Sequence, residues 1–375
     1  MNSPRIRSKK FLLFLIFLLP IMYLGGGFYF SLIRLAVSLL LLLVVLQNCN
    51  FKNKVNWPFL VFLCLLCGFV FRGKLYVLPS LIIFGSVYLL VYKTCVLPSD
   101  VLKSFVYGSL CTGLLGFLFM LSTNTYIKGG EFTEGVYGIS NLVVPLCLCL
   151  FIVYDTLRVI EKREKIVFHV IINVLLYSIV FFLEKRGPMV FCLLSIALAL
   201  IIKKSYLRKG LLLVIFAYPF YEIPITQFLI NNNKYIEKVF ERSNDYDDLE
   251  NNPRIKRLLV SQAFVSDMQI SDLWGYHKKL VIADNKYDRA HDHFHNAFLQ
   301  LYYERGALSV SLVFLIILQL GSLKESESWQ SRMLFSILCY LFLIGTNESL
   351  LQSGTAQELL TTVSLLLANK TDEKT

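Results

Sequence analysis

The chain has 375 residues, of which 56% are hydrophobic and 17% are charged, and its mean hydropathy is +0.60. Soluble globular proteins contain about 45–50% apolar residues, so this composition excludes separate soluble domains and indicates one membrane domain over residues 1–375. The net charge of +11 does not indicate a nucleic-acid partner, because Lys and Arg gather in short clusters between apolar runs, where the positive-inside rule expects them.

Apolar runs that could cross a bilayer follow one another along most of the chain. A spanning helix needs about 20 residues, so a chain of this length holds about twelve of them. We expect spans near residues 11–25, 28–46, 57–71, 75–93, 101–121, 136–154, 167–183, 188–202, 210–230, 306–320, 333–345 and 355–368. The predicted fold is an all-α polytopic integral membrane protein surrounded by membrane lipids.

The basic clusters predict which connections lie inside the cell. With a cytoplasmic N-terminus, the connections rich in Lys and Arg, such as 158–165 and 203–209, return inside, and the C-terminus is also cytoplasmic. Residues 122–135, the turn 184–187 and the long loop 231–305 then lie outside. Chemistry that meets extracytoplasmic water is expected in these three segments, above all in the long loop.

Two further kinds of protein are disfavoured. The nine cysteines lie in or beside apolar runs and the long loop has none, so we expect no disulfide framework. The chain also has no nucleotide-binding glycine fingerprint and no Walker loop, which disfavours a pump driven by ATP.

The turn that begins at Glu184 carries an arginine between two apolar runs. Charges between membrane helices are costly unless they meet water or a partner. Arg186 is therefore either an interfacial anchor that snorkels to the membrane surface or a guanidinium held at the mouth of a cavity, ready for bidentate contact with phosphate.

Two more arginines lie in the long loop. Asn252 and Pro253 predict an N-cap and first position of an amphipathic helix that continues to about Met268 and lies against the membrane or the bundle. Arg254 and Arg257 are three residues apart and share one side of its first turn. They form either a phosphate clamp or a solvated basic face.

Four of the five histidines fall in the same loop: His277, His291, His293 and His295. Three of them alternate and would share one face of an extended segment, which suits zinc, but one histidine at the junction of loop and helix suffices for acid–base chemistry. We predict no metal, so a histidine at that junction would serve as an acid or a base.

The pair His295-Asn296, followed by Glu304 and Gly306, resembles the end of the periplasmic loop in the O-antigen ligase superfamily, which also includes O-antigen polymerases. That family's Arg-Gly turn corresponds to Arg186-Gly187, and its loop arginine to Arg254 or Arg257. The similarity extends from Arg186 to the span after Gly306. Two family glycines are replaced here, by His277 and Ser309.

The resemblance implies a fold like that of the GT-C glycosyltransferases, with short amphipathic helices in a periplasmic catalytic loop. It also implies transfer of O-antigen glycan from undecaprenyl diphosphate to a sugar hydroxyl of lipid A-core, in lipopolysaccharide biosynthesis at the periplasmic face of the inner membrane. Arg186, Arg254 and Arg257 would stabilise the diphosphate. His295 would act as the general base, and Asn296 or Glu304 would orient it. The residues expected to bind substrate are Arg289, His293, Asn296 and Glu304. The transfer would invert the anomeric centre and need neither metal nor cofactor.

Three alternatives stay open from the sequence. An O-antigen polymerase would use the same donor but a lipid-linked repeat unit as acceptor. A polysaccharide transporter or flippase would place ionisable residues along a pathway through the membrane. A non-enzymatic assembly factor would need none of these residues for chemistry.

Overall fold

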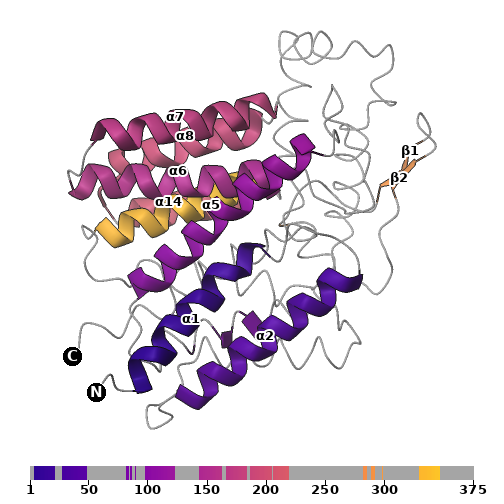
Figure 1. Ribbon diagram of the computed structural model, residues 1–375. Helices are drawn as coiled ribbons and strands as arrows, with labels where there is room; N and C mark the ends of the chain where they lie inside the picture. The colour runs from indigo at the N-terminus through magenta and orange to yellow at the C-terminus, as the bar shows by residue number, and fades with distance from the viewer. Residues whose placement is uncertain are drawn as a thin grey trace, which may run out of the picture.

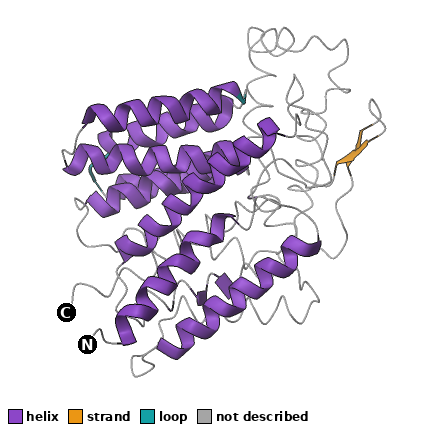
Figure 2. Ribbon diagram, in the orientation of Figure 1, coloured by secondary structure: helices purple, strands orange, loops and turns teal. Residues whose placement is uncertain are grey.

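The described part of the computed structural model is a bundle of helices with one short hairpin (Figures 1 and 2). It covers residues 4–21, 28–48, 82–83, 85–86, 89, 98–122, 143–162, 166–183, 186–204, 206–218, 282–284, 289–291, 298 and 329–346. The helices are α1 (Pro4–Ile21), α2 (Phe28–Asn48), α5 (Pro98–Ser122), α6 (Val143–Lys162), α7 (Ile166–Phe182), α8 (Arg186–Ile201), the helical residues 206–218 and α14 (Trp329–Gly345). The strands are β1 (Ile282–Asp284) and β2 (Arg289–His291).

The prediction of helices at the apolar runs is confirmed for the described residues. The helices α2, α5, α7, α8 and α14 begin and end within four residues of the expected spans. The expected spans near 57–71, 306–320 and 355–368, and most of 75–93, lie outside the described residues.

Two of the described helices are long and apolar enough to cross a membrane, Ser99–Ser122 within α5 and Val143–Lys162, which is α6. By themselves they are a weak indication of membrane association, because the core helix of a soluble protein has the same length and composition. The apolar face of α7 adds to this indication. Its side chains include Val167 and Phe181, which are 73% and 71% exposed, and large exposed apolar patches occur where a protein meets lipid or another protein.

The central helix of the described bundle is α6. It packs against α5, α7, α8 and α14, and its side chains are buried on all sides from Val143 to Asp155 (Figure 1). A helix that is apolar all round belongs in the interior of a bundle. The residues on α6 therefore hold fixed positions relative to four other helices.

The predicted end of this central helix is wrong. We expected a span at 136–154 followed by a basic connection, but α6 runs from Val143 to Lys162 and includes Asp155 and Arg158. A charged residue is expected at the end of a membrane span when water is its only partner. Here both charged side chains have partners on neighbouring helices. The pattern of hydrophobic residues does not show that a charged residue has a partner far away in the sequence.

The helices α1 and α5 approach each other closely at Gly108. A Cβ atom at this position would collide with the backbone carbonyl of Phe17, whereas one at Gly210 would meet open space. Small residues that let two backbones come together are typical of helix pairs in membranes.

We expect Gly108→Ala to lower the thermal stability of the purified protein in detergent. The methyl group must push α1 away from α5, and such overpacking costs about 1–3 kcal/mol. Gly210→Ala is the matched control, because the same methyl group meets nothing there and alanine favours a helix. An equal melting temperature for the two variants would contradict the close approach of the helices.

Candidate functional site

Most of the predicted site lies outside the described residues. This applies to Arg254, Arg257, His293, His295, Asn296 and Glu304. The backbones of Arg186 and Arg289 are described, and so is Phe298, three residues beyond His295.

Arg186 is the first residue of α8. The preceding helix α7 ends at Phe182, and a short turn connects the two helices. The hydroxyl of Tyr177 on α7 donates to the carbonyl of Met189 on α8 at 3.2 Å, which fixes the beginning of α8 against α7. The first amides of a helix have no partner within the helix, and the helix dipole is positive there. The backbone at this end of α8 therefore suits an anion.

The direction of α14 relative to α8 follows from one buried arginine. Nε of Arg208 donates to the carbonyl of Ile202, the residue after α8, at 2.8 Å, and its guanidinium lies 5.7 Å from the centre of the Phe335 ring on α14. The end of α8 therefore lies beside the first half of α14, and the two helices pack along much of their length. They are antiparallel, so Arg186 lies toward the end at which α14 finishes.

Phe298 packs toward this same end. Its ring lies 5.1 Å from that of Phe216, in the helical residues 206–218, and 5.2 Å from that of Phe342 on α14. We call Phe216, Phe298 and Phe342 the aromatic cluster. Phe298 is 3% exposed, so this residue, three positions after His295, belongs to the core.

Helix rise gives the spacing along the bundle. At 1.5 Å per residue, α8 extends about 24 Å from Ile202 to Arg186, and α14 extends about 10 Å from Phe335 to Phe342. Along the bundle axis, the backbone of Arg186 and the aromatic cluster thus both lie in the same direction from the contact between Arg208 and Phe335.

Arg289 belongs to the hairpin. β1 and β2 are antiparallel, with Asp284 opposite Arg289 and Ile282 opposite His291, and Figure 1 shows the hairpin clear of the helices on the right. The amphipathic helix expected from Asn252 to about Met268 lies outside the described residues, and no strand was predicted in this loop. An extended backbone at His291 is the conformation that the zinc alternative assumed, but His293 and His295 lie outside the described residues.

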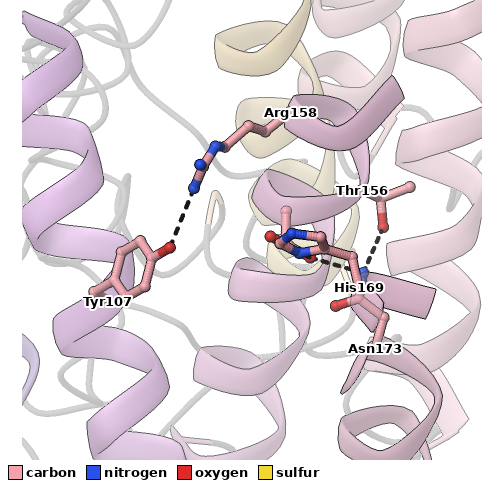
Figure 3. Close-up of polar contacts among 6 residues, drawn as sticks. Tyr107, Thr156, Arg158, His169 and Asn173 are labelled. Atoms are coloured by element: carbon pink, nitrogen blue, oxygen red, sulfur yellow. Dashed lines mark hydrogen bonds and ion pairs between the residues drawn. The ribbon is translucent and has the colours of Figure 1, made fainter. Parts of the chain in front are cut away.

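A buried polar cluster that the sequence analysis missed joins α6 to α7. Asp155 is 1% exposed. Its carboxylate accepts a hydrogen bond from Nδ2 of Asn173 at 3.1 Å and lies 3.0 Å from Nδ1 of His169 (Figure 3). Nδ2 of Asn173 also donates to the hydroxyl of Thr156 at 3.4 Å. We call Asp155, Thr156, His169 and Asn173 the α6–α7 polar cluster.

A second polar contact joins α6 to a different helix. Nη1 of Arg158 donates to the hydroxyl of Tyr107 on α5 at 3.2 Å (Figure 3). Side-chain hydrogen bonds therefore connect α6 to α5 and to α7 near its C-terminal end, where the sequence predicted a loop.

The sequence contains an indication of the α6–α7 polar cluster. His169 and Asn173 are four residues apart in an apolar run and so share one face of a helix. Polar residues on one face of a membrane helix require a partner on a neighbouring helix. Asp155 was not predicted as that partner because it falls just after the expected end of the span.

The polar cluster is separate from the predicted site. Between His169 and Phe182, α7 rises about 20 Å, so the cluster lies at the opposite end of α7 from Arg186. Chemically it pairs a carboxylate with an imidazole, and its geometry suits holding two helices together.

We expect Asp155→Ala to lower the thermal stability of the protein, because His169 and Asn173 lose a buried acceptor. Leaving buried donors unpaired costs about 1–3 kcal/mol. Asp155→Asn is the matched variant and should cost less, since its amide oxygen still accepts one hydrogen bond. The melting temperature in detergent measures both, and a result in which the asparagine variant is the less stable one would contradict this interpretation.

No model of a protein family, no curated protein and no solved structure matches this chain.

Proposed function

We propose that the protein is a glycosyltransferase of the O-antigen ligase type. It transfers a glycan from undecaprenyl diphosphate to a sugar hydroxyl of lipid A-core at the periplasmic face of the bacterial inner membrane. It spans the membrane about twelve times, with both termini in the cytoplasm and the loop 231–305 in the periplasm.

One observation carries the proposal, the order of three motifs on one predicted side of the membrane. Arg186-Gly187 comes first, the pair Arg254 and Arg257 follows, and His295-Asn296 stands at the end of the loop. The packing of the helices supports it, because the backbone of Arg186 and the aromatic cluster lie toward the same end of the bundle. A packing with these two features at opposite ends would have contradicted the proposal.

In this mechanism the acceptor hydroxyl attacks the anomeric carbon of the donor sugar. A new carbon–oxygen bond forms as the bond from that carbon to the diphosphate oxygen breaks, and the electron pair of the broken bond leaves on the diphosphate. The acceptor proton passes to the neutral imidazole of His295, which later returns it to water. Direct displacement inverts the anomeric centre.

The arginines stabilise the leaving group. Negative charge grows on the diphosphate as the glycosidic bond breaks, and guanidinium groups oriented in advance favour that charge over the ground state. Arg186 adds to the positive end of α8, and Arg254 or Arg257 approaches from the loop. The lipid diphosphate already carries the activation, so the reaction needs no ATP.

A second candidate function is suggested by the α6–α7 polar cluster. A buried carboxylate and imidazole within membrane helices are typical of transporters that move substrates or protons. A flippase for the lipid-linked glycan would use such residues and would make no new glycosidic bond.

The test is transfer by the purified protein in vitro. The donor is a synthetic undecaprenyl-diphosphate glycan, and the two acceptors, offered separately, are lipid A-core and a lipid-linked repeat unit. We expect product on lipid A-core, with the same yield when a chelator is present. Product only on the repeat unit would identify a polymerase, and transport of the donor across liposomes without any product would identify a flippase.

A further inference from the structure

We propose that Arg208, Arg332 and Ser336 form a binding site for a phosphate anion, which we assign to the headgroup of an anionic phospholipid. The site lies at the end of the bundle where α8 finishes and α14 begins. Arg208 and Ser336 are buried and Arg332 is half-buried, so Arg332 is the member that a ligand reaches first. This inference goes beyond glycan transfer and uses only the proposed placement of the chain in the membrane.

Two guanidinium groups lie near each other at this end of the bundle. Arg208 donates to the carbonyl of Ile202, and its guanidinium lies 5.7 Å from the centre of the Phe335 ring. Arg332 precedes Phe335 by three residues and so shares its side of α14. Burial lowers the pKa of Arg208, and the positive charge of Arg332 lowers it further. Because arginine keeps its proton in proteins, the pair concentrates positive charge that a bound anion would compensate.

Two buried polar atoms on α14 indicate a ligand. They are Nε of Arg332 and Oγ of Ser336, and neither has a hydrogen-bond partner in the described part of the chain. Arg332 and Ser336 are four residues apart, so they lie one turn apart on one face of the helix. Both atoms carry a hydrogen, and phosphate oxygens accept such hydrogen bonds.

Ser336 differs from the other buried hydroxyl residues that the structure describes. Each of those donates to a backbone carbonyl three or four residues earlier in the chain, and they are Ser38, Ser86, Ser109, Thr112 and Ser195. Such a bond satisfies the hydroxyl within its own helix. Ser336 makes no such bond, so its hydroxyl is available to a ligand.

The carboxylates of the described helices have other partners or are exposed. Asp100 pairs with Lys9, and Asp155 pairs with His169. Glu161 is exposed near the end of α6. An anion that compensates the arginine pair therefore comes from outside these helices.

The position of the pair favours a phospholipid. Arg208 lies in the basic connection 203–209, and Arg332 comes directly before the expected span 333–345. By the positive-inside rule this end of the bundle faces the cytoplasm, where basic pockets between membrane helices bind the headgroups of anionic lipids. Leu207, next to Arg208, is exposed and suits contact with an acyl chain.

The experiment measures the melting temperature of the full-length protein in detergent as a phosphate compound is added. The probes are phosphatidylglycerol, which is anionic, phosphatidylcholine, which is zwitterionic, and inorganic phosphate. We expect only phosphatidylglycerol to raise the melting temperature, because a ligand that binds the folded state alone stabilises it. An equal rise with inorganic phosphate that Arg332→Gln abolishes would support the phosphate site and identify free phosphate as its ligand.

Arg332→Gln should weaken the binding of phosphatidylglycerol about 10-fold, because a hydrogen-bonded charge is lost. Arg332→Lys should recover only part of the affinity, since lysine keeps the charge but lacks the planar fork. Lys203→Gln is the matched control. It removes an exposed positive charge at the same end of the bundle and should weaken binding much less.

Ser336→Ala separates a ligand site from a structural role. Without lipid, this variant should be at least as stable as the wild-type protein, because it removes a buried hydroxyl that has no partner in the part of the chain that the structure describes. With phosphatidylglycerol it should gain less stability than the wild type, since one donor to phosphate is lost. A role confined to stability predicts the opposite result without lipid.

Two results would overturn the inference: equal affinity of the wild type, Arg332→Gln and Ser336→Ala for phosphatidylglycerol, or no stabilisation by either phosphatidylglycerol or inorganic phosphate. The experiment does not involve glycan transfer, so absence of transfer would refute the proposed function and leave this inference standing. Recovery of the protein from cells without detergent would refute the placement in the membrane and, with it, the assignment to a lipid.

Discussion

Replacing His295 with alanine is expected to lower glycan transfer by about 10²–10⁴-fold, the usual contribution of a general base. The acceptor hydroxyl then has no group to take its proton as it attacks. Transfer from a labelled lipid donor to lipid A-core, compared between the wild-type protein and the folded variant, checks this expectation.

His291→Ala is the matched control for this experiment. His291 lies in β2, four residues before the proposed base, and is assigned no part in the reaction. It should retain transfer, with or without chelator. Full activity of folded His295→Ala would show that another group is the base, and loss of wild-type activity with chelator would favour the zinc alternative.

Replacing Arg186 with alanine is expected to lower kcat by about 10²–10³-fold, as does removal of one group that stabilises charge in a transition state. The effect should fall on kcat more than on the KM for the donor, because the negative charge on the diphosphate grows during bond cleavage. Arg186→Lys should recover only part of the rate, since lysine keeps the charge but lacks the planar fork that binds two phosphate oxygens.

Lys162→Ala is the matched control for Arg186. Lys162 is an exposed basic residue at the last position of α6, at the other end of the bundle from Arg186. Its loss should leave kcat unchanged. If Arg186 is instead an anchor at the membrane surface, Arg186→Lys will restore full activity, and Arg186→Ala will reduce the amount of protein in the membrane rather than kcat.

The sequence by itself determined the secondary structure of the described residues well. Helices such as α2 and α7 form where apolar runs predicted them, because a helix satisfies its own backbone hydrogen bonds with partners four residues away. The composition of a short stretch of sequence is therefore enough to predict where such a helix forms. The end of α6 shows the limit, since the helix continues through Asp155 and Arg158, whose partners His169 and Tyr107 lie on other helices.

For the candidate site, the sequence determined which side chains suit the chemistry and their order along the chain. Only the tertiary structure decided that the end of α8 lies beside Phe335, so that α8 begins toward the end of the bundle where Phe342 and Phe298 lie. It also decided that Asp155 and His169 form a separate cluster at the opposite end of α7. The physical reason is that these contacts join residues from different helices. They depend on how whole helices pack against one another, and no short stretch of sequence encodes that packing.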